Sequence, residues 1–148
     1  MEGNEMFRSF DISGSGLQAE RTRMEVIATN IANAGVTRMA DGSGPYRRKE
    51  VVFAQELSRA MMLRSPEQGG RVGGVSVAEV SPDPAPFQRV HRPSHPDADS
   101  EGYVLMPNVN VAFEMVDLLT ASRAYEANLS TLRAFQEMMR QTLSIGRA

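Results

Sequence analysis

The sequence predicts an α+β fold, in which long N- and C-terminal helices pack as an antiparallel, coiled-coil-like pair and a small β-rich module lies between them. Two observations predict it. All eight prolines lie from Pro45 to Pro107, and proline blocks helix interiors and removes a donor from strand ladders. Apolar residues recur at helical spacing on both sides of that region. We therefore expect a discontinuous helical domain formed by residues 1–40 and 107–148, and a β-rich module with loops at 41–106.

The first helix is predicted from about Phe7 to Ala34. Its apolar residues recur every seven positions, with Ile27 as an intervening step: Phe10, Leu17, Met24 and Ile31. This is the spacing of a narrow apolar seam. The Ser13–Gly16 stretch (Ser-Gly-Ser-Gly) predicts a frayed segment, a kink or a helix start capped by Ser15, because glycine costs about 1 kcal/mol relative to alanine in a helix. Gly35 is expected to stop the helix in a left-handed conformation.

The last helix has the stronger pattern. Taking the four-three series of positions 111, 115, 118, 122, 125, 129, 132, 136, 139 and 143, eight of the ten residues are apolar. Asn110 or Asn108 is the expected N-cap, and Gly146 the expected end, which gives a helix roughly 50 Å long. A helix of that length reaches past the core that a chain of this size can offer, so we expect it to seek partners.

Packing residues follow from the two seams. They are Leu17, Met24, Ile27, Ile31, Met115, Leu118, Tyr125, Leu129, Leu132, Met139 and Leu143. Packing within one chain and packing between subunits are equally compatible with this pattern, and the two can coexist.

The middle of the chain contains short strand candidates. The alternation and β-branching of Val75–Val80 predict a strand, and two more are expected at Phe87–Val90 and Tyr103–Met106. Residues 46–54 fit either a strand or the start of a short helix that continues through Leu63. A flexible turn is expected where Gly69-Gly70 and Gly73-Gly74 bracket the chain.

Composition excludes several classes of protein. The formal net charge of −2 provides no basic surface for nucleic acid, and the absence of cysteine excludes disulfides and thiolate metal sites. No apolar run approaches the ~20 residues that a membrane-spanning helix needs. The N-terminus has neither the basic nor the apolar region of a cleavable secretory signal.

Catalytic and cofactor signals are also weak. The two histidines, His91 and His95, are four apart as in helical zinc sites, but Pro93 and Pro96 oppose a helix there. Asp97, Asp99 and Glu101 alternate like the start of a calcium loop but lack its later bidentate glutamate. We therefore expect no enzyme activity, no metal and no cofactor.

Several motifs together resemble a known family. Leu17-Gln18-Ala19, together with Asn30-Ile31-Ala32-Asn33-Ala34, is similar to the N-terminal signature of flagellar rod, hook and hook-associated proteins. Within that axial family, five further segments resemble the basal-body rod proteins in order and spacing: 41–53, 95–99, 102–104, 107–117 and 121–128. The motif residues are Asn30, Asn33, Pro45, Tyr46, His95, Pro96, Tyr103, Pro107 and Asn108. Gly35-Val36 and His91 depart from the usual residues of the family.

The resemblance implies a structural subunit of the proximal rod, which is the periplasmic part of the basal-body drive shaft that transmits torque and encloses the export channel. It implies assembly with copies of itself, other rod proteins, the export-gate/rod adaptor and distal rod subunits. It also implies passage through the flagellar type III export apparatus without signal cleavage. The alternatives are a soluble helical adaptor or export chaperone and, less compatible with the residues, a small metalloenzyme built on His91 and His95.

Overall fold

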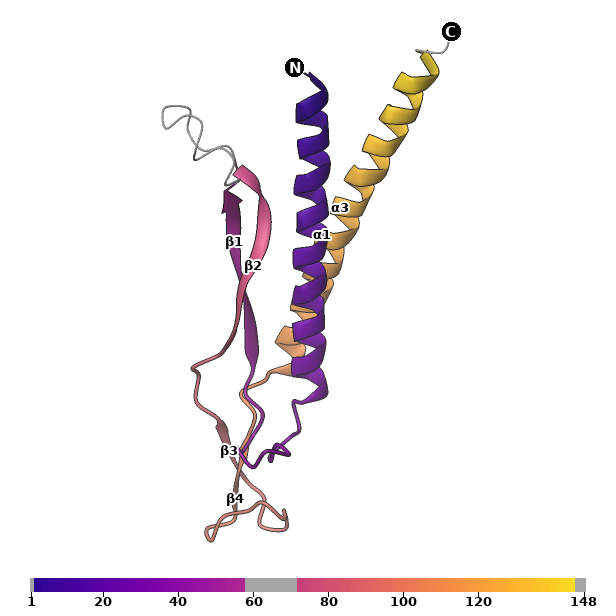
Figure 1. Ribbon diagram of the computed structural model, residues 1–148. Coiled ribbons are helices and arrows are strands. Elements are labelled where there is room, and N and C mark those ends of the chain that lie inside the picture. Colours follow the sequence, from indigo (N-terminus) through magenta and orange to yellow (C-terminus); the bar gives the residue numbers. More distant parts are fainter. Residues whose placement is uncertain (1, 58–71, 146–148) are drawn as a thin grey trace. The chain divides into compact units, whose positions relative to one another are not determined.

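The computed structural model describes residues 2–57 and 72–145 (Figure 1). Its elements follow the order α1 (Glu2–Ala32), β1 (Lys49–Leu57), β2 (Val72–Pro82), β3 (Gln88–His91), β4 (Tyr103–Met106) and α3 (Val111–Ile145). Two long terminal helices that pack together, with two-stranded antiparallel sheets between them in the sequence, confirm the predicted α+β class.

The chain divides into two compact units, and each combines segments from both helices with segments from the middle. One unit comprises Met1–Thr22, Val52–Glu79 and Ala121–Ala148. The other comprises Arg23–Val51 and Val80–Thr120. Most of the buried helix side chains are small or polar: Ala19 and Ala121 in the first unit, and Asn30 and Glu114 in the second. Ile27, also in the second unit, is a larger apolar exception.

Helix α1 begins before Ser13–Gly16 and includes it, so the expected helix start capped by Ser15 is wrong. Tertiary contacts explain why glycine is accommodated there. A Cβ at Gly16 would lie 3.0 Å from Nδ2 of Asn128 on α3. The Ser15 hydroxyl donates to the Ile12 carbonyl at 2.8 Å and accepts from the Val75 backbone N–H of β2 at 3.1 Å. Glycine and serine here allow close approach of two neighbouring elements.

The end of α1 also differs from the expectation. The helix ends at Ala32, and Gly35 does not have the positive φ that a left-handed stop requires. Instead, the Asn33 backbone N–H and the Asn33 side-chain amide both donate to the Thr29 carbonyl, at 3.1 and 2.8 Å. The Asn33 side chain therefore adds a second hydrogen bond to a carbonyl of the last helical turn.

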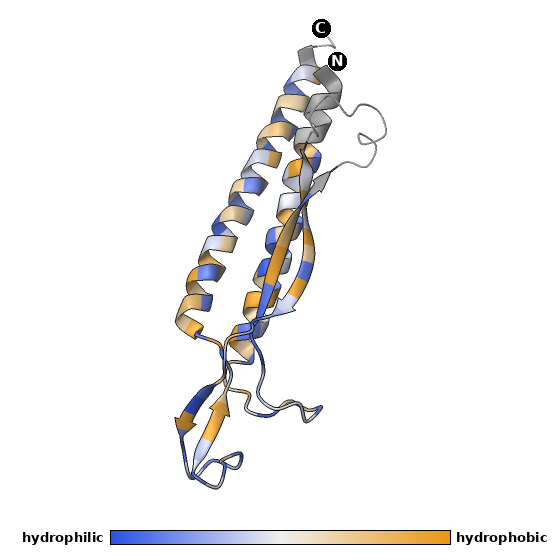
Figure 2. Cartoon of the chain, turned by 90° about the vertical axis from the view of Figure 1, so that its left-hand side faces the viewer, coloured by the Kyte–Doolittle hydropathy of each residue, from blue (hydrophilic) through white to orange (hydrophobic). Residues whose placement is uncertain are grey.

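Helix α3 begins as predicted. The Asn110 Oδ1 accepts hydrogen bonds from the backbone N–H groups of Ala112 and Phe113, at 3.0 and 3.3 Å, which makes Asn110 the N-cap. The helix continues to Ile145, and the expected stop at Gly146 lies outside the described residues. Figure 2 shows apolar and polar residues interleaved along both helices.

The strands resolve the ambiguity of the middle segment. Residues 49–57 form a strand, β1, which pairs with β2 in a two-stranded sheet; the alternative of a helix through Leu63 extends outside the described residues. Gly73-Gly74 belongs to β2, and the other end of the expected flexible turn, Gly69-Gly70, lies outside the described residues. Strands β3 and β4 form an antiparallel pair in which Gln88 faces Met106 and His91 faces Tyr103.

The β3–β4 pair buries little apolar surface. Val104 is its buried side chain, with 1% of its surface exposed, while Leu105 on the opposite face is 46% exposed. Asp99 closes the connection between the strands by accepting hydrogen bonds from the backbone N–H groups of Glu101 and Tyr103. These two bonds lower the pKa of Asp99, and the Arg89 guanidinium contributes further.

Candidate functional site

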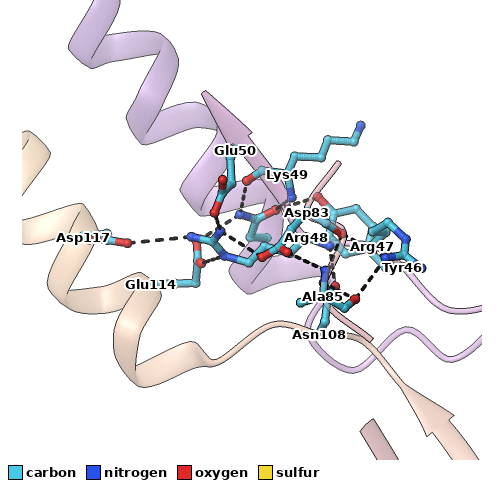
Figure 3. A network of polar contacts seen from close by, with 11 residues as sticks. Tyr46, Arg47, Arg48, Lys49, Glu50, Asp83, Ala85, Asn108, Glu114 and Asp117 are labelled. Carbon is cyan, nitrogen blue, oxygen red and sulfur yellow. Dashed lines mark hydrogen bonds and ion pairs between the residues drawn. The ribbon is translucent and has the colours of Figure 1, made fainter. Parts of the chain in front are cut away.

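A buried polar network occupies the unit formed by residues 23–51 and 80–120 (Figure 3). Its centre is Asn30, near the end of α1, which is completely buried. The Asn30 Nδ2 donates to the Lys49 carbonyl at 2.9 Å and to Glu114 Oε2 at 3.0 Å. The Asn30 Oδ1 accepts from the Tyr46 hydroxyl at 2.9 Å and from the Lys49 N–H at 3.0 Å. Both donors and both acceptor positions of the amide are used.

Glu114 joins this network from the first turn of α3. Its side chain is 1% exposed, and a carboxylate so buried requires ionic and hydrogen-bonding partners. Arg48 Nε donates to Glu114 Oε1 at 2.6 Å, while Asn30 satisfies Oε2. Burial by itself would lower the pKa of Arg48, but the hydrogen bond and charge of Glu114 outweigh it and raise that pKa. Burial raises the pKa of Tyr46, and the negative charge of Glu114 raises it further.

The Arg48 guanidinium faces three more carboxylates. Its Nη1 contacts Glu50 and lies 3.3 Å from Asp83 Oδ2, and its Nη2 lies 3.9 Å from Asp117 Oδ2. Figure 3 shows these carboxylates around Arg48, whereas the side chain of Lys49 points away from the cluster. One guanidinium therefore links β1, the segment after β2 and two turns of α3.

Asn108 and Arg47 bind the segment that follows β2 and hold it next to Arg48. The Asn108 Oδ1 accepts from the Arg48 N–H at 2.9 Å, and its Nδ2 donates to the Ala85 carbonyl at 3.2 Å. Arg47 Nη1 donates to the carbonyls of Asp83 and Ala85, at 2.9 and 3.0 Å. The guanidinium of Arg47 also lies 4.3 Å from the centre of the Phe87 ring, where a cation–π attraction adds to these hydrogen bonds.

The motif residues divide into those in the network and those outside it. Asn30, Tyr46 and Asn108 meet in the network. Pro107, which directly precedes Asn108 in the sequence, is also buried. Pro45 and Tyr103 line a cleft of about 460 Å³. His95 accepts the Asp97 N–H on its Nδ1 at 3.1 Å, its neighbour Pro96 is exposed, and Asn33 holds the end of α1 as described above.

The expected packing residues show a range of burial. Ile27 is buried, whereas Met115 and Leu143 are 55% and 67% exposed. The remaining eight are half-buried: Leu17, Met24, Ile31, Leu118, Tyr125, Leu129, Leu132 and Met139. Among the α3 residues whose burial is described, the buried ones are Glu114 and Ala121. Each lies one residue before a position in the four-three series, because a paired glutamate and a small alanine face inward, whereas the larger Met115 does not.

An exposed apolar face marks the first three turns of α3. Phe113, Met115, Val116 and Leu119 are 71%, 55%, 60% and 61% exposed, and Ala112 and Thr120 are exposed beside them. We call these six residues the α3 apolar face. Further along the helix the outward positions are mostly small or polar, for example Ser130, Ala134 and Gln141. Exposed apolar surface of this kind marks sites of association rather than ordinary solvent-facing helix.

Two family descriptions match this chain. "Flagella basal body rod protein" matches residues 10–38, and "Flagellar basal body rod FlgEFG protein C-terminal" matches residues 100–145. These ranges contain Asn30 and Glu114, respectively, so the network connects the two matched segments.

Similar proteins match over almost their whole length. Flagellar basal-body rod protein FlgC from Borreliella burgdorferi is 39% identical, over 95% of this chain and 97% of its own. The protein of the same description from Yersinia enterocolitica is 44% identical, over 93% of this chain and 95% of its own. That from Bacillus subtilis is 38% identical, over 95% and 98%.

Proposed function

Since this chain belongs to the FlgC family of flagellar basal-body rod proteins and is a structural subunit of the rod, we propose that it polymerises into the proximal rod as part of a torque-transmitting shaft that encloses the export channel. The observation that carries this proposal is similarity along nearly the whole chain, including both terminal helices and the segment between them. Each relative named above is a rod protein, which favours this role over a soluble adaptor or chaperone.

Subunit contacts are best supported at the α3 apolar face. Its four large side chains are all more than half exposed, so a single chain leaves them in water. Burying them against a neighbouring subunit would be favourable at about 25 cal/mol per Å² of apolar surface removed from water. Met115 belongs to this face, and Leu143 near the other end of α3 offers a second exposed apolar side chain.

A tubular polymer follows if the contact joins different surfaces of neighbouring copies. A head-to-tail interface that does not close on itself generates a helical assembly, whereas a self-complementary one stops at a dimer. In this arrangement residues 1–40 and 107–148 form the axial helical layer, and residues 41–106 form an outer module that meets other rod proteins. The partners would be copies of this chain, the export-gate/rod adaptor and distal rod subunits.

The proposed location is the periplasmic rod of the basal body, reached through the flagellar type III export apparatus without removal of a signal peptide. Over residues 2–57 and 72–145, the helices are not apolar enough at sufficient length to cross a bilayer.

The experiment compares two glutamate substitutions on the outside of α3. Leu119→Glu places a charge in the α3 apolar face, and Ser130→Glu, the matched control, places the same charge at an exposed polar position three turns later. In cells with the variant as sole copy, Leu119→Glu should abolish swimming and the rods seen by electron microscopy of basal bodies, while Ser130→Glu should retain both. Circular dichroism of the purified chains should be unchanged. Normal rods with Leu119→Glu would contradict the proposed contact.

A further inference from the structure

The apolar pattern alone does not determine how far α1 is displaced along α3. Leu17, Met24 and Ile31 recur every seven residues, and the four-three series of α3 has the same period. Sliding one helix by seven residues therefore places apolar positions opposite apolar positions again. Alternative registers of this kind must be excluded by residues that do not repeat.

The buried residues of the helices are unusual in this respect. Among the described residues, the largest fully buried side chains are Glu114, Val104 and Asn30, and two of these three are polar and belong to the helices. The most deeply buried apolar residues on the helices are small, Ala19 and Ala121, with Ile27 the larger exception. Apolar burial is therefore modest, and it provides little energetic preference for one register over another.

A seven-residue slip would separate the polar partners. It moves Glu114 by roughly 10 Å along α1, at 1.5 Å per residue, and the 3.0 Å hydrogen bond from Asn30 cannot survive that displacement. Arg48, just before β1, is bound to Glu114 at 2.6 Å and, through its backbone N–H, to the Asn108 side chain. The next residue, Lys49, is bound to Asn30 on α1, so a slip that separates Asn30 from Glu114 must break one of these two sets of bonds. A buried amide and a buried carboxylate would lose their partners, which is strongly unfavourable.

We propose that Asn30, Glu114 and Arg48 select the register of α1 against α3, and we call these three residues the register lock. Buried polar residues that find hydrogen-bond partners in only one alignment of two helices specify the register of the pair, at some cost in stability. The lock is a property of the single chain and does not depend on how the chain assembles.

The contact between Gly16 and Asn128, in the unit that contains residues 1–22 and 121–148, corresponds to the same register of α1 against α3. Gly16 lies against Asn128, with 3.4 Å between a Cβ built at Gly16 and the Asn128 Cγ. Asn30 is 14 residues after Gly16, and Glu114 is 14 residues before Asn128, so both contacts correspond to one antiparallel register. After a slip of seven residues, Gly16 would face Ala121 or Phe135 instead.

Disulfide trapping in the full-length purified chain can test the lock, because the natural sequence has no cysteine. The pair Gly16→Cys with Asn128→Cys reports the observed register, since a Cβ at position 16 lies 3.4 Å from the Asn128 Cγ and a disulfide needs such close approach. Gly16→Cys combined with Ala121→Cys or with Phe135→Cys reports the two slipped registers. Cross-linked peptides are quantified by mass spectrometry after equilibration in a glutathione redox buffer.

With the register lock intact, the 16–128 disulfide should form and the slipped pairs should remain at background. Asn30→Leu with Glu114→Leu replaces the polar pair by apolar side chains, and should raise cross-linking of at least one slipped pair about tenfold while helical circular dichroism persists. Unchanged background levels in a helical double variant would overturn the proposal. So would failure of the 16–128 pair to form with the lock intact.

A milder variant covers the case in which the double variant does not fold. Glu114→Gln preserves shape, but its amide presents one acceptor oxygen where the carboxylate presents two, so Arg48 Nε or Asn30 Nδ2 loses its acceptor. It should raise slipped cross-linking severalfold, and no increase would contradict the lock. Gln136→Leu, at an exposed position of α3, is the matched control and should leave all three cross-links unchanged.

Discussion

Asn30 and Glu114 lie 84 residues apart in the sequence, yet their side chains are joined by a 3.0 Å hydrogen bond and each is at most 1% exposed. The bond connects the end of the first long helix to the first turn of the last. Because both side chains are removed from water, each depends on the other and on Arg48 and Tyr46 for its hydrogen bonds. The stability of this unit should therefore respond strongly to small changes in the network.

Glu114→Ala should destabilise the chain by about 3–5 kcal/mol, because removing one member of a buried ion pair leaves the other charge uncompensated. Arg48 would retain its contacts with Glu50, Asp83 and Asp117. Because its charge would still be partly compensated, we expect a loss of stability near the lower end of that range. Urea unfolding followed by circular dichroism measures the change. Glu126→Ala, at an exposed position of the same helix, should change the free energy of unfolding by less than about 0.5 kcal/mol. Equal effects of the two substitutions would argue against a buried network.

Tyr46 should make stability depend on alkaline pH. Its pKa is raised from the ordinary value of 10.0 by burial and by the nearby Glu114 charge, so the folded state holds the phenol proton more tightly than the unfolded state. The stabilisation is complete below pH 10 and is lost as the pH rises from there through the folded-state pKa.

The matched variant for this pH dependence is Tyr46→Phe, which also removes the hydroxyl donor to Asn30. It should cost about 1 kcal/mol at neutral pH. Unfolding free energies measured for both proteins from neutral pH to above pH 11 should converge as the wild type loses its Tyr46 contribution. Parallel curves over the whole range would show that the Tyr46 proton is not linked to folding.

Two glycines should respond in opposite directions to alanine. At Gly74, φ is +136° and an added Cβ would lie 2.6 Å from the Ser15 Oγ, so Gly74→Ala should destabilise by about 1–3 kcal/mol. At Gly14, inside α1, an added Cβ meets nothing within 4 Å, and Gly14→Ala should stabilise by about 0.5–1 kcal/mol. Thermal unfolding of the two variants compares them directly. A stabilised Gly74→Ala protein would show that the Ser15–β2 contact is not close.

Local sequence patterns predicted the elements well where they were long or regular. The absence of proline and the four-three series located α3, and the β-branched alternation located β2. The Ser13–Gly16 stretch misled, because helix propensity is local while Gly16 and Ser15 are accommodated by Asn128 and Val75 from distant segments. Tertiary contact outweighs a propensity of about 1 kcal/mol per glycine.

The polar network was not predictable from periodicity. Asn30 and Tyr46 belong to recognised motifs, but nothing in their spacing says that they meet. Glu114 reads as an acidic residue in the first turn of a helix, a position that favours exposed carboxylates through the helix dipole. The available signal was that Glu114 falls one turn before Leu118 and two turns before the small Ala121 on a common helix face.

The four hydrogen bonds of Asn30 have a mechanical consequence. They connect α1 with Lys49 and Tyr46 on one side and with Glu114 on the other, across chain segments that lie side by side. Because all four bonds end on the side-chain amide of one residue, a force that pulls α1 along its own axis acts on all four together. Bonds loaded together resist far more force than bonds broken in turn, so rupture under axial load should begin elsewhere in the chain.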